Sequence, residues 1–191
     1  MSDSHLKFTL QGDGLARVLE TMGKLADGAA AKAGARAVNH TGEKASTAAV
    51  KALTRQIGLK PRAGAQLLKK RLRTYPASAG KPSFELVTFS GALPMGEFAP
   101  TQLSKGWAFK PWNDSKGAHQ FARAFTVRKW QGAYLMRVGK ERFPLKRLRG
   151  PSVKKELIKD APPLGFEAVV TRDLPARVEH EARRIAPDVF T

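Results

Sequence analysis

An alanine-rich run of helical periodicity near the start of the sequence constrains the fold more than any other feature. From Leu15 to Ile57 the apolar residues recur at every third or fourth position, which is the spacing of one helix face. Most of them are alanine, so this face permits close packing but buries little area per residue. Glycines interrupt the run, and we expect a bend or break near Gly28. A helix of this kind needs a neighbour, and we expect it to contribute to a contact between subunits.

Downstream of this run the pattern changes from helix to strand and back to helix. Gly58 is suited to end the first helix, and Pro61 is suited to the first turn of a short second one. The apolar residues of the second helix are Leu67, Leu68 and Leu72. Loop residues then separate short strands such as Phe84–Phe89, and helical spacing returns at Leu174–Ile185.

The clearest strand pair is Phe121–Arg128 followed by Ala133–Val138, joined by a loop with glycine near its end. A turn at 139–142 leads into a further strand, which makes a β-meander. We expect the large apolar side chains of the pair to face the core and its arginines to lie nearer solvent or a partner. The core residues are Phe121, Phe125, Tyr134 and Met136, and the arginines are Arg123 and Arg137. By strict alternation Arg123 shares the face of Phe121, so a bulge or a buried ion pair is required there.

These elements predict an α+β fold. Its parts are a long N-terminal helix with a bend, a second short helix, an antiparallel β-meander and a C-terminal helix. We divide the chain into a helical N-terminal region (1–73), a β-rich basic region (74–160) and a C-terminal helical segment (161–191). A length of 191 residues with 42% hydrophobic residues suits one compact domain that contains all three.

The composition argues against several classes of protein. Cysteine is absent, so the chain offers no disulfide, no thiolate metal site and no thiol nucleophile. No apolar run approaches the roughly 18 residues that a spanning helix needs, and the first residues lack the form of a signal peptide. We therefore expect a soluble protein, made in the cytoplasm, with no membrane partner.

Enzymatic function has little support in the sequence. The histidines are scattered, and the motif around His180 lacks the second histidine of a helical zinc site. The glycines at 12–14 and 28–34 do not follow a strand with the spacing of a phosphate-binding loop. We expect no catalytic residues, no metal and no cofactor.

The charge of the chain is concentrated in its middle. The whole sequence has 34 lysines and arginines against 16 acidic residues, a formal net charge of +18. Residues 1–43 hold five basic and five acidic residues and residues 150–191 hold seven of each, which leaves 22 basic against four acidic residues at 44–149. Such a block requires a polyanion, an acidic partner or solvent salt to compensate it.

Two clusters in this block are the candidates for contact with DNA or with an acidic partner. They are Lys69, Lys70, Arg71 and Arg73, and Lys140, Arg142, Lys146, Arg147 and Arg149. Contacts of this kind neutralise phosphates without reading the bases. Trp107, Trp112 and Trp130 lie among basic residues, as in platforms that bind single strands, but they suit the core or an interface equally well.

Several short segments resemble one family of phage proteins. They are Arg36–Thr41, Ala52–Lys60, Leu93–Phe98, Phe121–Phe125, Arg137–Leu145 and Leu148–Val153. Together they resemble the phage minor tail protein Z family, the tail-completion proteins of long-tailed phages. The likeness covers most of residues 15–155, and the chain after Lys155 carries little of it.

The resemblance implies a structural virion protein without enzymatic activity. Such a protein is made in the host cytoplasm, completes the head-proximal end of the tail and helps to join the tail to the DNA-filled head around the DNA channel. The implied partners are further copies in a hexameric ring, neighbouring tail and head–tail joining proteins, and genomic double-stranded DNA. The alternative is a sequence-independent nucleic-acid-binding protein. Under either reading, the basic clusters could instead dock onto acidic surfaces of neighbouring proteins.

Overall fold

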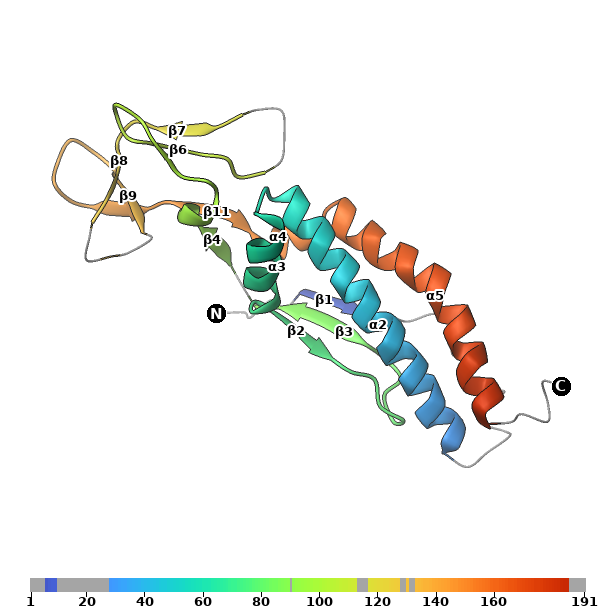
Figure 1. Ribbon diagram of the computed structural model, residues 1–191. Coiled ribbons are helices and arrows are strands. Elements are labelled where there is room, and N and C mark those ends of the chain that lie inside the picture. Colours follow the sequence, from blue (N-terminus) through green and yellow to red (C-terminus); the bar gives the residue numbers. More distant parts are fainter. Residues whose placement is uncertain are drawn as a thin grey trace.

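Two long helices lie side by side and run in opposite directions, and short strands form most of the remaining structure (Figure 1). The computed structural model describes residues 6–9, 28–89, 91–112, 117–127, Trp130 and 133–185. The long helices are α2 (Ala29–Gln56) and α5 (Ala161–Ile185). The shorter ones are α3 (Pro61–Lys69), α4 (Val153–Leu157) and the 3-10 turn η1 (Met95–Glu97). This arrangement confirms the predicted α+β fold.

Glycines delimit α2 at both ends. Gly28 precedes the helix with a left-handed φ of 69°, so no continuous helix passes through it, which confirms the predicted break. The predicted part before this residue, 15–27, lies outside the described residues. Gly58 ends the helix with a φ of 73°, and the next N–H, that of Leu59, donates to the carbonyl of Thr54 at 3.0 Å.

Two predicted helix boundaries are wrong. The second helix ends at Lys69, and Leu72 belongs instead to the strand β2 (Leu72–Tyr75), because it pairs there with Thr88. The last helix begins at Ala161 and not at Leu174. Two prolines and a glycine near its start look like helix breakers, but prolines in a first turn lack only N–H groups that have no helical partner.

The described strands form four small antiparallel sheets. The first has the order β1 (Leu6–Thr9), β3 (Glu85–Thr88), β2, and the second pairs β4 (Ala92–Pro94) with β11 (Arg149–Ser152). The third has the order β5 (Thr101–Gln102), β6 (Trp107–Phe109), β7 (His119–Phe121). The fourth has the order β10 (Leu145–Arg147), β9 (Tyr134–Arg137), β8 (Ala124–Thr126), which confirms the meander.

The strand predicted at Phe121–Arg128 is divided between two sheets. Phe121 ends β7 opposite Trp107, a turn follows, and Ala124 opens β8 opposite Met136. Arg123 lies exposed in that turn. The conflict in strict alternation is resolved by this break, because the chain leaves one sheet and enters the next at Arg123.

α5 covers the alanine-rich face of α2. Three contacts follow one another along the two helices. Arg36 meets Glu181, Lys44 meets Asp173, and Ala52 meets Gly165. At the last point, a Cβ on Gly165 would lie 3.7 Å from the Cβ of Ala52, an ordinary packing distance. The alanine face therefore has its neighbour within the chain, and this face lends no support to the expected contact between subunits.

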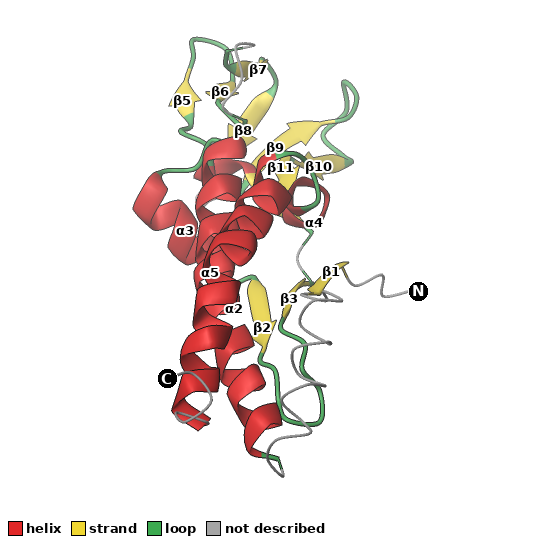
Figure 2. Cartoon of the chain, turned by 90° about the vertical axis from the view of Figure 1, so that its right-hand side faces the viewer, coloured by secondary structure: helices red, strands yellow, loops and turns green. Residues whose placement is uncertain are grey.

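α2 also packs against the first sheet, which lies beside it in Figure 2. Asn39 exchanges two hydrogen bonds with the backbone of Ala77, at 2.9 and 2.6 Å, just beyond the end of β2. The core continues from the helices into the strands. Its fully buried large side chains include Leu53, Ile57, Leu68, Phe84, Leu93, Phe98, Phe109 and Leu157.

The strands β5 to β10 gather at one end of the helical pair, away from the first sheet (Figures 1 and 2). We call the part from β4 to β11 the strand lobe.

No helix among the described residues is both long and apolar enough to span a bilayer.

Candidate functional site

The described residues contain no group of three or more histidine, aspartate or glutamate side chains that could hold a metal ion. The buried carboxylates have nearby cations of their own. Glu181 pairs with Arg36 and Arg177, and Glu156 lies 3.3 Å from the Nζ of Lys159. Among the described residues, the candidate functional groups are therefore lysine and arginine side chains.

The nine candidate residues do not form one site. Six of them line two grooves that share no residue, one in the strand lobe and one where α3 meets β2. The first groove has a volume of about 520 Å³ and contains Lys146, Arg147 and Arg149. The second has a volume of about 660 Å³ and contains Lys70, Arg71 and Arg73.

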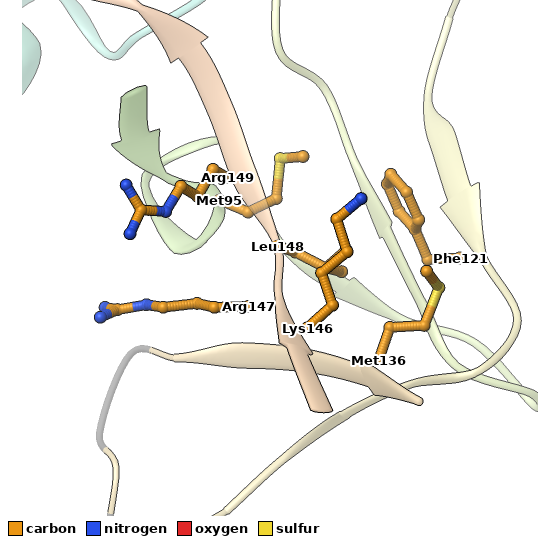
Figure 3. A pocket seen from close by; sticks show the side chains of 7 residues that line it. All are labelled: Met95, Phe121, Met136, Lys146, Arg147, Leu148 and Arg149. Carbon is orange, nitrogen blue, oxygen red and sulfur yellow. The ribbon is translucent and has the colours of Figure 1, made fainter. Parts of the chain in front are cut away.

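The first groove lies where the chain passes from one sheet to another. β10 pairs with β9, β11 pairs with β4, and Leu148 stands between them. The Leu148 side chain is buried, and its N–H donates to the carbonyl of Tyr134 at 2.7 Å. This anchor fixes Arg147 and Arg149 on either side of it. Figure 3 shows their two side chains extended in the same direction, on one side of the strand.

Lys146 lies on the opposite side of the strand from the two arginines. In Figure 3 its side chain extends toward Met95 and Phe121, and Met136 lies beside it. This alternation follows from the strand geometry, in which successive side chains point to opposite faces. The groove thus has an apolar side with one ammonium group, and a second face that carries a guanidinium pair.

Ring contacts hold the groove in place. Phe109 packs edge-on against Phe121 and Tyr134, with centroids 5.9 and 4.8 Å apart, and Trp107 packs against Tyr134 at 5.0 Å. The two contacts of Tyr134 join the β5–β6–β7 sheet to the meander. Burial also raises the pKa of Tyr134, so this phenol stays neutral at ordinary pH.

Gly150 sets the position of β11. A Cβ at this residue would meet the buried ring of Phe98 at less than van der Waals distance, so only glycine admits the ring so close to the strand. Arg149 precedes this contact and is exposed. The core therefore fixes the backbone of both arginines while their charged groups face solvent.

The remaining residues of this cluster are at the turn between β9 and β10. Lys140 and Arg142 are exposed there, and the Arg142 guanidinium lies 5.8 Å from the ring centroid of Phe143, itself 64% exposed. Neither residue lines the first groove. The turn therefore carries exposed cations that are not part of the groove.

The second groove combines cations with apolar side chains. Leu67 and Phe89 line it beside Lys70, Arg71 and Arg73. The Arg73 guanidinium lies 5.5 Å from the ring centroid of Phe89. Lys69, the last residue of α3, is exposed and does not line this groove.

Two carboxylates of the helical layer, Asp173 and Glu181, are paired with nearby cations. Hydrogen bonding to Arg172 lowers the pKa of Asp173. Burial would raise the pKa of Glu181, but the hydrogen bond from Arg36 and the charges of the neighbouring arginines outweigh it, so that pKa is lowered. In contrast, no carboxylate of the described residues lines the first or the second groove.

The sequence shows the cations, but it does not show which apolar residues lie beside them. Met95 and Phe89 come from segments distant in sequence from the clusters, and no local pattern marks them. The tryptophans form no shared platform. Trp107 packs on Tyr134, Trp112 lies 5.5 Å from the ring of His119, and Trp130 is exposed in the loop between β8 and β9.

Comparison with known proteins gives no relatives: no family, no curated protein and no solved structure matches this chain. Functional inference therefore rests on the residues and on their arrangement. The feature with the clearest chemistry is the guanidinium pair of the strand lobe. Its backbone is fixed, its side chains are exposed, and none of the described carboxylates lines its groove.

Proposed function

We propose that the protein is a structural, non-enzymatic component of the virion of a long-tailed phage. It completes the head-proximal end of the tail and helps to join the tail to the DNA-filled head. The segments that resemble the phage minor tail protein Z family support this proposal. They include the residues of the β9–β10 turn and of the strand that carries Arg149.

The observation that carries a contact with DNA is the exposed pair Arg147 and Arg149. Two guanidinium groups on the same side of a strand meet phosphates through charge and hydrogen bonding, without reading bases. A contact of this kind suits a channel protein, because the genome must be attracted but must also pass at ejection. Lys140 and Arg142 add two exposed cations at the adjoining turn between β9 and β10.

The proposed assembly is a hexameric ring of copies around the DNA channel, bounded by neighbouring tail and head–tail joining proteins. Ring closure requires two different, complementary surfaces on each copy. The net charge of +18 must be compensated when copies are brought together. Genomic DNA is a polyanion that is present where the head joins the tail.

Deletion of the gene from the genome that encodes it tests this function. We expect DNA-filled heads and separate tails in negative-stain images, and restored particles when the gene is supplied from a plasmid. Mass spectrometry of purified particles should detect the protein. Normal joined particles without the gene, or purified particles without the protein, would contradict the proposal.

The second candidate is a sequence-independent nucleic-acid-binding protein that acts outside a virion. The same cations favour it, since neutralising phosphates needs no tail. The two candidates differ in where the protein is found. Detection in lysate but not in purified particles would favour the second candidate.

A further inference from the structure

The outer edge of β2 is open in the described part of the chain. β2 pairs with β3 on one side, and no described strand pairs with its other side. In Figure 1, β2 forms the outer margin of its sheet. An edge strand of an antiparallel sheet directs the N–H and C=O groups of alternate residues outward, where another strand can pair with them. Arg73, Thr74 and Tyr75 are exposed along this edge.

The second groove adjoins the start of this edge. Its cations come from both sides of the α3–β2 junction, with Lys70 after the helix and Arg73 in the strand. The ring of Phe89 is 51% exposed, although Arg73 lies over it. The surface therefore offers backbone groups, positive charge and an aromatic ring in one place.

We propose that this surface, the outer edge of β2 together with the second groove, binds an extended acidic segment of a partner protein. The segment adds to the sheet as a strand beside β2, and its carboxylates meet Lys70 and Arg73. This contact goes beyond the proposed DNA contact and does not depend on it, because it uses another surface of the molecule.

The backbone chemistry of the edge favours a peptide over a nucleic acid. Outward N–H groups need acceptors, and outward C=O groups need donors. A second peptide strand supplies both, whereas a DNA backbone supplies only acceptors and would leave the carbonyls of β2 without partners. Apolar side chains in the groove also favour a segment with side chains of its own.

The charge of the edge selects among peptides. A short charged edge discourages pairing with similar strands, which is a common protection against aggregation. Pairing of β2 with β2 of another copy would bring like charges together, so a second copy is disfavoured. A strand that carries carboxylates is the class for which the same charge becomes an attraction.

Alternation along β2 places the charges on one side. Arg73 and Tyr75 share a face of the sheet, and the buried Leu72 shares the other face with Thr74. An added strand of alternating residues can therefore present every carboxylate on the Arg73 side. A peptide of about six residues, the usual length of a strand, is long enough to test this.

The experiment uses the full chain and a blocked, fluorescent peptide of alternating glutamate and valine. Fluorescence anisotropy gives the Kd, and amide hydrogen exchange by NMR locates the contact. We expect binding of the peptide with added protection of amides in Arg73–Tyr75. A peptide with the same glutamates but with proline in place of valine should bind at least tenfold more weakly, since it cannot pair as a strand.

Variants separate this surface from general attraction to a basic protein. Arg73→Glu should weaken peptide binding by about tenfold or more, as expected when a charge-assisted contact is lost. Lys105→Glu makes the same charge change at an exposed residue of the strand lobe and should leave the Kd unchanged. Should Arg73→Glu fold poorly by circular dichroism, Lys70→Glu serves in its place.

Three results would overturn the proposal: equal binding of the valine and proline peptides, no added protection in β2, or equal effects of Arg73→Glu and Lys105→Glu. Duplex DNA serves as a second ligand, so that the DNA contact and the peptide contact can be tested separately. Arg147→Glu should reduce DNA binding and leave peptide binding intact, so failure of the DNA contact and failure of this proposal give different results.

Discussion

Gly42 of α2 lies directly against the ring of Phe84. A Cβ at Gly42 would overlap the ring, and Phe84 is fully buried, so the ring has no open space into which to move. This contact sets how closely α2 approaches the sheet that contains β2 and β3.

Gly42→Ala should therefore destabilise the protein, although alanine is the better helix former. Overpacking at such a site costs about 1–3 kcal/mol, which exceeds the gain of roughly 1 kcal/mol from helix propensity. Gly165→Ala is the matched control in α5, because its nearest contact is 3.7 Å away. Urea titration should show a loss for the first variant and no loss for the second. Equal stability of the two variants would mean that the ring can move.

The pairing of Glu181 with Arg36 and Arg177 should make stability depend on pH. The Glu181 carboxylate is 1% exposed, and its oxygens lie 2.9 Å from Arg36 Nε and 2.5 Å from Arg177 Nη2. Its pKa is lowered in the folded protein, so its contribution is present above the ordinary glutamate pKa of about 4.3 and is lost as the pH falls through the folded value.

Glu181→Gln tests this pairing. At pH 7 we expect a loss of about 1–3 kcal/mol in the free energy of unfolding, and the difference from the unmodified protein should narrow below about pH 4. Glu179→Gln is the control, because that carboxylate is 52% exposed and pairs with Arg183 at the surface. A Glu181 variant that loses equal stability at pH 7 and pH 3 would show that the loss is one of packing.

The two phenylalanines Phe109 and Phe125 should differ in their contribution to stability. Phe109 is fully buried, whereas Phe125 is half-buried beneath the Arg137 guanidinium, 5.4 Å from its ring centroid. Phe109→Ala should cost about 3–5 kcal/mol. Phe125→Ala should cost about 1–2 kcal/mol, from partial burial and the lost cation–π contact. Equal losses in urea titration would place Phe125 in the core, as the sequence pattern suggested.

Duplex binding should weaken steeply with salt. We expect measurable binding of any duplex at low salt, and a fall of orders of magnitude by about 0.2 M salt. Arg147→Ala should lower the slope of log K against log salt by about 1, and the same change at Arg149 should add to it. Arg183→Ala is the control, because this guanidinium pairs with Glu179. Unchanged slopes in the groove variants would remove these arginines from the DNA contact.

Local patterns in the sequence predicted much of the fold. The start and end of α2 follow from glycines that adopt left-handed conformations, and the start of α3 follows from Pro61 at its first turn. The features that local patterns did not predict depend on pairing between strands that are distant in the sequence. Leu72 is in a strand because β3 lies beside it, and the turn at Arg123 exists because the flanking residues pair with different sheets.

The candidate site was predictable in composition but not in arrangement. Runs of lysine and arginine are visible in the sequence, and both basic clusters lie at grooves. Their separation, and the opposite sides taken by Lys146 and the two arginines, depend on how β10 and β11 join two sheets. Met95 comes from η1 and Phe121 from β7, so no local spacing places them beside the cations.

Ultraviolet crosslinking of intact phage particles, followed by mass spectrometry, tests whether the exposed arginine pair contacts the genome. We expect this protein to be present in the particles and genomic DNA to crosslink to peptides containing Arg147 and Arg149. Peptides from α5, in which Arg172 and Arg183 pair with Asp173 and Glu179, should remain without crosslinks. Particles that contain the protein but show no DNA crosslink to these two arginines would contradict the DNA contact.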